Sequence, residues 1–223
     1  MKKKTKPEDP IAHLRRADPR LAKIIDKVGP YAIKKQTTKT TFEALARSIV
    51  YQQLSGKAAA TIFGRLVDAL GGKLTPGAIA KASDKTLRGA GLSGSKAKSL
   101  RDLADKTMNG TVPSLARLHK MENEAIIEAL TQVRGIGRWS VEMLLMFRLE
   151  RGDVLPVSDY GIRKGFMRVY GKSELPSPTD LAEHGERWAP HRTMASWYLW
   201  RSLDQEAAAP LATKRERVAK KKQ

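Results

Sequence analysis

Apolar residues recur every three or four positions along most of this 223-residue chain. One such stripe runs through residues 42–50 and another through residues 59–70, which stops at Gly71 and Gly72 as a helix C-terminus does. We find no convincing run in which apolar and polar residues alternate, the pattern that a half-buried strand requires. The spacing therefore predicts an all-α protein.

The same spacing predicts helices in most of the remaining chain, with glycine or proline marking the turns between them. The predicted helices cover residues 21–28, 42–50, 59–70, 95–108, 126–130, 138–150, 160–170 and 190–203. We expect the large side chains of Trp188, Trp197 and Tyr198 to lie in the core.

The chain is strongly basic, with 42 lysine and arginine residues against 23 acidic ones and a net charge of +19. Residues 1–7 hold four lysines and no acid, and residues 211–223 hold six basic residues and one acid. The segment between them keeps a net charge of +10. We predict one folded domain over residues 11–205, a disordered basic tail at 1–10 and another at 206–223, and a polyanionic partner, DNA or RNA.

The sequence contains no cysteine, which excludes disulfides, thiolate zinc sites, cysteine nucleophiles and cysteine-ligated iron–sulfur clusters. Packing or surface roles, rather than metal binding, are expected for the four histidines, His13, His119, His184 and His191. No stretch is apolar for long enough to span a membrane, and the lysine-rich start lacks the apolar core of a signal peptide. We therefore expect a cytoplasmic, nucleoid-associated protein.

The sequence pattern of residues 124–150 predicts two helices joined by a tight turn. In this turn Gly135 and Gly137 flank Ile136. Glycine permits a positive φ and lets the backbone approach a ligand closely. The unpaired N–H groups at the start of the second helix, at its positive dipole end, suit a phosphate. An ordinary glycine-capped hairpin is the alternative, but in so basic a chain the turn favours a sequence-independent clamp on a DNA backbone. Its expected contact residues are Arg134, Gly135, Ile136, Gly137 and Arg138.

Four motifs are similar, in the same order, to those of a known family. They are IVYQQLSGKAA (49–59), LTQVRGIGRWS (130–140), PVSDYGIRKGF (156–166) and WAPHRTMASWYLWR (188–201). Over roughly residues 20–205 the chain resembles the helix-hairpin-helix DNA glycosylases, and their 3-methyladenine DNA glycosylase II branch in particular. Larger members of that branch carry an extra N-terminal β-rich domain, so this all-helical pattern resembles the compact form.

The resemblance implies two helical subdomains flanking a cleft. It also implies a monomeric enzyme that flips an alkylated purine out of duplex DNA, hydrolyses its N-glycosidic bond and leaves an abasic site. The aspartate of the third motif, Asp159, is then the catalytic carboxylate. Without the resemblance, an N-cap is the favoured interpretation of Asp159 beside Ser158, and both roles can coexist.

A carboxylate beneath the sugar stabilises the positive charge of an oxocarbenium-like transition state. Bases of the 3-methyladenine and 7-methylguanine type are already cationic, so they can leave without a second acid. Whether Asp159 also acts as a general base towards water is left open by the sequence. No cofactor is implied for catalysis.

Related enzymes that also cut the DNA backbone carry a lysine two residues after the second hairpin glycine, and this chain has Trp139 there. The resemblance therefore implies a monofunctional glycosylase without lyase activity. It assigns the base pocket to Trp139, Met143, Tyr160 and Trp200. Met143 stands where a larger family member has an aromatic residue, which affects the range of substrates. Core packing is the alternative for the aromatic residues.

The resemblance assigns the loop after the second predicted helix to filling the gap that a flipped base leaves. Gln53 is the first candidate for this role and Leu54 the second, and a plain polar loop is the alternative. Ser55, Gly56 and Lys57 would contact phosphate. Family hairpins can hold a structural monovalent cation, Na⁺ or K⁺, through main-chain carbonyls that here are those of Thr131, Val133 and Ile136.

Two other functions remain compatible with these residues. One is a glycosylase for neutral purine lesions such as hypoxanthine or ethenoadenine. The other is a non-catalytic protein that binds damaged DNA. Double-stranded DNA is the partner in each case.

Overall fold

The computed structural model describes residues 9–207. Residues 1–8 and 208–223, which include most of the two predicted basic tails, lie outside the described residues. Every regular element in the described chain is a helix, so the predicted all-α class is confirmed. None of these helices combines the length and apolar character needed to cross a lipid bilayer.

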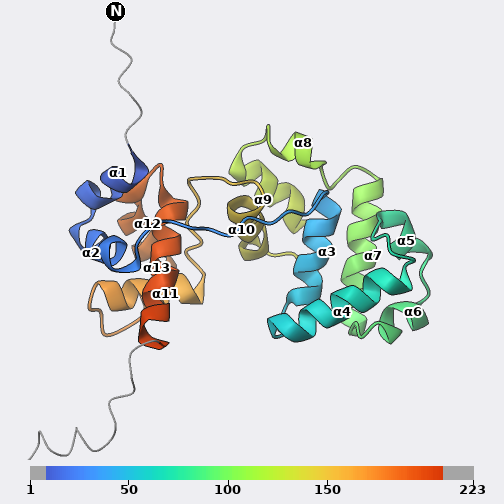
Figure 1. The fold of residues 1–223 in the computed structure, drawn as a ribbon. Coiled ribbons are helices and arrows are strands. Elements are labelled where there is room, and N and C mark those ends of the chain that lie inside the picture. The colour runs from blue at the N-terminus through green and yellow to red at the C-terminus, as the bar shows by residue number, and fades with distance from the viewer. Residues whose placement is uncertain (1–8, 208–223) are drawn as a thin grey trace, which may run out of the picture. The chain divides into compact units, whose positions relative to one another are not determined.

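The chain divides into two compact units (Figure 1). Unit 1 is discontinuous, because it combines the described residues up to Ile33 with those from Gly152 onward. Its helices are α1 (Pro10–Ala17), α2 (Pro19–Val28), α11 (Tyr160–Val169), α12 (Pro178–Gly185), the 3-10 turn η1 (Glu186–Trp188) and α13 (Arg192–Ala207). Unit 2 is the continuous segment Lys34–Arg151.

The helices of unit 2 include several short ones that the apolar spacing does not predict. They are α3 (Thr41–Tyr51), α4 (Gly56–Ala69), α5 (Pro76–Lys81), α6 (Asp84–Gly89), α7 (Gly94–Met108), α8 (Leu115–Leu118), α9 (Asn123–Thr131) and α10 (Arg138–Phe147). The long helix α7 packs against α3 on one side and against α5 and α6 on another. It buries Ala97, Leu100, Leu103 and Ala104.

Three predicted boundaries differ from the structure. The helix expected to run to Glu150 ends at Phe147 with Arg148 as its C-cap, and Glu150 itself has a φ of 56°, outside the right-handed helical region. The last helix begins at Arg192 and continues to Ala207. The first helix starts at Pro10, just before the predicted start of the folded domain, and Asp9 caps it.

The core of unit 1 contains the aromatic side chains that the sequence places there. Trp188 and Tyr198 are fully buried, and Trp197 is nearly so. They pack with Ile162 and Phe166 of α11. α11 and α13 approach closely at Gly165, where an added Cβ would collide with the main-chain carbonyl of Leu199.

A buried carboxylate joins four segments of unit 1. Asp18 lies between α1 and α2, and its Oδ1 caps α2 by accepting the N–H groups of Arg20 and Leu21. Its Oδ2 accepts hydrogen bonds from the Tyr170 hydroxyl, the Trp188 indole and the His184 ring. Burial acts to raise the pKa of Asp18, but hydrogen bonds from His184, Tyr170, Leu21 and Trp188 outweigh it and hold that pKa well below its ordinary value.

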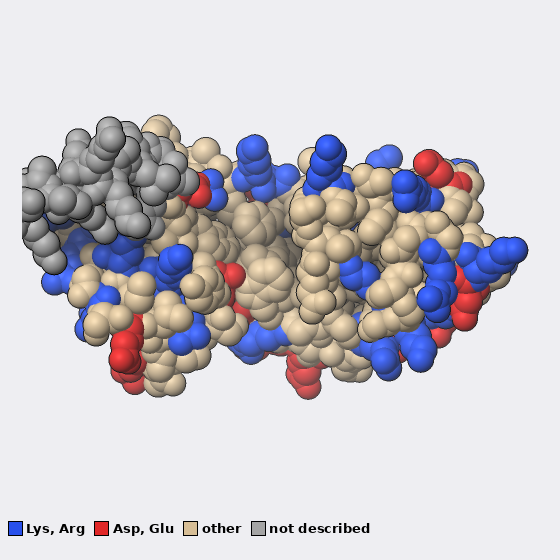
Figure 2. Space-filling model, turned by 90° about the horizontal axis from the view of Figure 1, so that it is seen from below, with Lys and Arg blue, Asp and Glu red and all other residues tan. Residues whose placement is uncertain are grey.

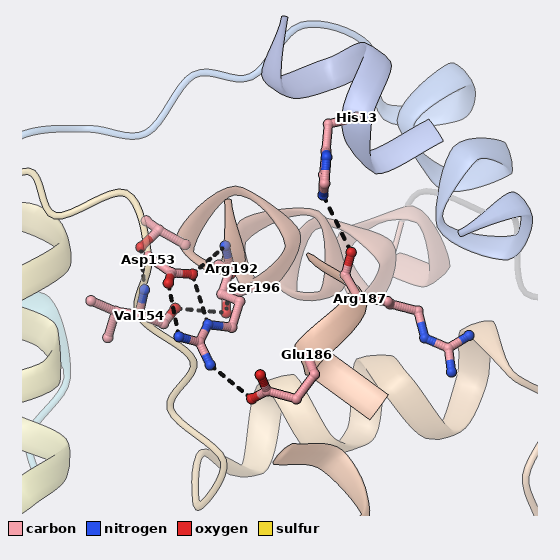
Figure 3. A network of polar contacts seen from close by, with 8 residues as sticks. His13, Asp153, Val154, Glu186, Arg187, Arg192 and Ser196 are labelled. Carbon is pink, nitrogen blue, oxygen red and sulfur yellow. Dashed lines mark hydrogen bonds and ion pairs between the residues drawn. The ribbon is translucent and has the colours of Figure 1, made fainter. Parts of the chain in front are cut away.

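The chain re-enters unit 1 through a loop that is tied to the start of α13 (Figure 3). The Arg192 guanidinium makes two hydrogen bonds to the carboxylate of Asp153, of 2.7 and 2.8 Å, and a third to Glu186. The N–H of Val154 donates to the Thr193 hydroxyl at 3.0 Å. These contacts fix the segment that leads to α11.

Candidate functional site

Asp159 is held at the start of α11 by two donors. Its backbone is non-helical, with φ −66° and ψ 122°, and its Oδ1 accepts the N–H of Ile162 at 2.8 Å. The same oxygen accepts the indole Nε1–H of Trp200, on α13, also at 2.8 Å. The N-cap interpretation of Asp159 is therefore confirmed, and the half-buried carboxylate has a fixed orientation at the positive end of a helix.

Gly161 makes room for the indole that contacts Asp159. A Cβ at this position would lie 2.9 Å from Cδ1 and 3.0 Å from Nε1 of Trp200. A Cβ at these distances would force the indole to shift, so glycine lets the indole lie across the start of α11. Tyr160, which stands between Asp159 and Gly161 in sequence, is 64% exposed.

The hairpin of unit 2, formed by α9, residues 132–137 and α10, has the predicted geometry. Gly135 adopts a φ of 78°, and the N–H of Ile136 closes the turn on the carbonyl of Val133 at 3.0 Å. The Ile136 side chain is buried, so the turn presents backbone rather than side chain. Within the described chain, no side chain caps the start of α10, whose N-cap is Gly137. Its first-turn N–H groups are the kind that bind a phosphate.

The two arginines of the turn have different surroundings. Arg134 is exposed, and its backbone N–H donates to Asp102 at 2.7 Å. Arg138 is also exposed, but its guanidinium is paired with Glu124 on α9 and with Glu142 one turn along α10. The side chain of Glu142 is almost fully buried, so an ion pair inside the hairpin is its role. Hydrogen bonds from Arg138 hold the pKa of Glu124 below its ordinary value.

The α3–α4 loop, residues 52–55, exposes its two central side chains. Gln53 has a φ of 58°, a left-handed conformation that few residues other than glycine adopt, and Leu54 is 39% exposed. The Ser55 hydroxyl caps α4 by accepting the N–H of Ala58. Gly56 and Lys57 form the exposed first turn of that helix.

A hollow of about 460 Å³ opens beside this loop in unit 2. Trp139 and Met143 of α10 line it together with Gln53, so the structure brings these three predicted residues to one place. Trp139 is 45% exposed. The Arg47 guanidinium lies 3.8 Å from the centre of the Tyr51 ring on the opposite wall. The volume is in the range of small-ligand pockets.

Comparison with known proteins gives the family of the chain. Residues 46–191 match the HhH-GPD superfamily base excision DNA repair proteins. The chain belongs to this superfamily. DNA-3-methyladenine glycosylase 1 of Schizosaccharomyces pombe is 37% identical over 193 residues, which cover 85% of each chain.

Two solved structures resemble this HhH-GPD protein over nearly its whole length. One is the 3-methyladenine DNA glycosylase Mag1 of S. pombe in complex with abasic DNA, with 37% identity, a TM-score of 0.77 and coverage of 86% of this chain and 95% of the other. The second is a DNA-3-methyladenine glycosidase of Bacillus halodurans, with 35% identity, a TM-score of 0.81 and coverage of 91% and 93%.

The predicted site residues of this HhH-GPD protein fall into two groups. Asp159, Tyr160 and Trp200 belong to unit 1, whereas the hairpin, the α3–α4 loop, Trp139 and Met143 belong to unit 2. The family match spans both units. Among residues 9–207, no three His, Asp or Glu side chains gather as a metal site.

The sequence did not predict three residues that contact the proposed site residues or line the hollow. Gly161 could have been found, because it stands directly after the Asp-Tyr pair of the third motif. Asp102, which accepts the backbone N–H of the hairpin turn, lies 32 residues away from it and has no signal in the sequence. Arg47 is within a predicted helix, where nothing indicates that it faces a hollow.

Lysine and arginine side chains also gather away from these residues. Figure 2 shows them over the part of unit 2 that α4, α5 and α6 form, with acidic side chains among them. Basic side chains therefore lie on the surface of the folded part of the protein as well as in the sequence of the ends.

Proposed function

We propose that this HhH-GPD protein is a DNA-3-methyladenine glycosylase that acts as a monomer on alkylated purines in duplex DNA. The observation that carries the proposal is the fixed carboxylate of Asp159, held by Ile162 and Trp200 at the start of α11. The names of the relatives that match most of the chain support the same substrate class. Mag1, which is similar in fold and sequence, was solved with DNA, and this supports binding of duplex DNA.

The proposed mechanism assigns a separate task to each group of residues. The N–H groups of the hairpin turn and of the α4 start bind phosphates on the DNA backbone. Gln53 or Leu54 fills the space that the flipped base leaves. Trp139 and Tyr160, whose rings are exposed, and Trp200 offer aromatic faces, which attract a cationic base by roughly 0.5 to 2 kcal/mol.

The Asp159 carboxylate then stabilises the positive charge that develops on the sugar as the bond to the base breaks. An alkylated purine that carries a positive charge leaves as a neutral molecule, so it needs no protonation. Water completes the reaction and leaves an abasic site. Because Trp139 occupies the position of the lyase lysine, we propose that the enzyme forms no Schiff base with the sugar.

The hairpin carbonyls suit the monovalent cation that the resemblance implies. Main-chain oxygens are the donors that hard cations prefer, and a carbonyl has two lone pairs. The Val133 carbonyl, which accepts the Ile136 N–H, therefore keeps one for an ion. Thr131, Val133 and Ile136 would hold Na⁺ or K⁺, whose charge would strengthen phosphate binding at the turn.

The decisive experiment compares base release by the wild type, Asp159→Asn and Asp68→Asn. Asp68 is exposed near the end of α4, so its variant removes one carboxylate without touching the proposed site. Methylated duplex DNA is the substrate, released bases are separated by chromatography, and strand breaks are scored before and after alkali.

We expect the wild type and Asp68→Asn to release 3-methyladenine, with breaks only after alkali. Asp159→Asn should bind the DNA but release base at least about 10²-fold more slowly. Comparable release from hypoxanthine or ethenoadenine duplexes would instead assign a neutral lesion. Binding without release by any of the three proteins would make this a damage-recognition protein.

A further inference from the structure

One face of α7 contacts both loops to which the proposed function assigns DNA binding in unit 2. Lys96, Ser99 and Asp102 follow one another at intervals of three residues, so they lie along one side of the helix. Lys96 contacts the α3–α4 loop, Ser99 faces Gly135, and Asp102 accepts the N–H of Arg134. None of the three is in a motif that the function has used.

Lys96 caps the C-terminal end of α3 with its side chain. Its ammonium donates to the carbonyl of Val50 at 2.7 Å and to that of Gln52 at 2.8 Å. Carbonyls at a helix C-terminus have no partner within the helix and carry its negative dipole end. A cation that holds two of them therefore fixes where the helix stops and how the loop begins. Partial burial lowers the pKa of Lys96, which indicates that the ammonium has given up part of its hydration for these contacts.

The loop needs such support, because its next residue is held in an unfavourable conformation. Gln53 has a φ of 58°, a left-handed conformation that is strained for a residue other than glycine. Without the contacts from Lys96, the loop could relax into other conformations. Gln53 and Leu54 would then be displaced from the places they now occupy.

The loop is also joined directly to the hairpin. The side-chain amide of Gln52 donates to the carbonyl of Gly135 at 2.8 Å. Ser99 packs against Gly135: its Oγ would lie only 2.8 Å from a Cβ added at Gly135. The contacts therefore form a closed ring that runs from Lys96 through Gln52 and Gly135 to Ser99 and back along α7.

We propose that Lys96 is a positioning residue for base flipping, which fixes the α3–α4 loop relative to the hairpin so that backbone binding and filling of the gap occur together. The inference rests on the proposed function, in which this loop enters the duplex. Lys96 touches neither base nor sugar, and its contribution passes through the loop. Loss of its contacts raises the cost of extruding a paired base and leaves the chemical step unchanged.

Lys96→Met tests this, with Lys98→Met as the matched control. Lys98 is exposed on the same helix, so the control removes the same charge without touching the loop. Single-turnover release of 7-methylguanine is measured from two duplexes. In one the base is paired with cytosine, and in the other it is a one-nucleotide bulge, where extrusion costs least.

Lys96→Met should slow release from the paired duplex by about tenfold, and release from the bulge by less than about twofold. Lys98→Met should leave both rates at the wild-type level. Equal slowing on the two substrates, or no slowing, would show that Lys96 has no specific part in flipping. Lys96→Arg, which can still donate to both carbonyls, should recover part of the difference between the substrates.

The two proposals fail in different ways. If the wild type releases neither 7-methylguanine from the bulge nor 3-methyladenine from methylated duplex DNA, the proposed function is wrong. The positioning role is then still tested by duplexes with 2-aminopurine at the target site, whose fluorescence rises on extrusion without any bond cleavage. If the 2-aminopurine fluorescence rises as much with Lys96→Met as with the wild type, the inference is overturned.

Discussion

The indole nitrogen of Trp200 and Oδ1 of Asp159 lie 2.8 Å apart, although 41 residues of sequence separate them. Because Oδ1 also accepts the N–H of Ile162, two donors from different helices fix the position of this carboxylate oxygen. A carboxylate that is already oriented need not reorganise when charge develops beside it, and this is the main way in which enzymes use electrostatic stabilisation.

Trp200→Phe should slow base release because it keeps an aromatic ring at this position but removes the indole N–H that donates to Asp159. Hydrogen bonds to charged groups contribute roughly 1.5 to 3 kcal/mol, so a loss of about 10- to 100-fold is expected in single-turnover rate. The dissociation constant for methylated duplex DNA should stay near the wild-type value. A wild-type release rate for the variant would mean that the contact does not orient the carboxylate.

Gly161→Ala should have a similar effect, because the new methyl group would displace the indole from Asp159. We expect release to slow by about tenfold or more, with the thermal midpoint checked beside the rate. Gly64→Ala is the matched control, since Gly64 lies inside α4 and no atom is within 4 Å of its added Cβ. It should stabilise the protein by about 0.5 to 1 kcal/mol and leave release unchanged. Equal rates in the two variants would contradict the role of Gly161.

Asp18→Asn should destabilise unit 1 in a pH-dependent way. The pKa of Asp18 in the folded protein lies below its ordinary value of 3.8, so the stability that its charge contributes is complete above that value and is lost as the pH falls through the folded pKa. Near neutral pH we expect a loss of about 3 kcal/mol in the free energy of unfolding, because a buried hydrogen-bonded charge is removed.

Urea unfolding of the wild type and the variant should therefore differ most near neutral pH, and the difference should shrink below about pH 4. Asp26→Asn serves as the control, because Asp26 is largely exposed and pairs with the exposed Arg15. It should change stability by less than about 1 kcal/mol at either pH. A difference for Asp18→Asn that stays constant across this range would rule out the charge as its cause.

Arg134→Ala and Arg138→Ala should affect DNA binding differently. The guanidinium of Arg138 is committed to Glu124 and Glu142, whereas Arg134 has its side chain exposed at the turn. We expect Arg134→Ala to weaken binding to undamaged duplex and to reduce the slope of log affinity against log salt by about 1. Arg138→Ala should lower the thermal midpoint and change that slope less. If the two slopes fall equally, Arg138 leaves its ion pairs when DNA binds.

The sequence predicted the helices whose stripes are long enough to be unambiguous. The helices α2, α3, α4, α7, α10 and α11 each overlap a predicted segment closely. The missed helices α1, α5, α6 and α8 have between four and eight residues and bury a single side chain each, Leu14, Ile79, Leu87 and Leu118. One buried residue defines no period, so an argument from spacing cannot find them.

Their first residues do carry a signal of another kind. Asp9 and Thr75 each precede a proline and cap the helix that follows, as Ser177 does for α12. A search for caps followed by proline would therefore have found the starts of α1 and α5, and also that of α12, which the apolar spacing does not predict either. The Trp200–Asp159 and Lys96–Gln52 contacts have no comparable signal, because they depend on how distant helices pack.

The division of the chain at Ile33 and Gly152 bears on the order in which the molecule is completed during synthesis. The helices α1 and α2 leave the ribosome before unit 2, but α2 packs against α11 and α13, which are made after it. Unit 2 is continuous and is finished in between. Because domains generally fold as they emerge, protease resistance in nascent chains of increasing length should appear first in the inserted unit, and the Asp159 carboxylate should acquire its indole partner only at the end.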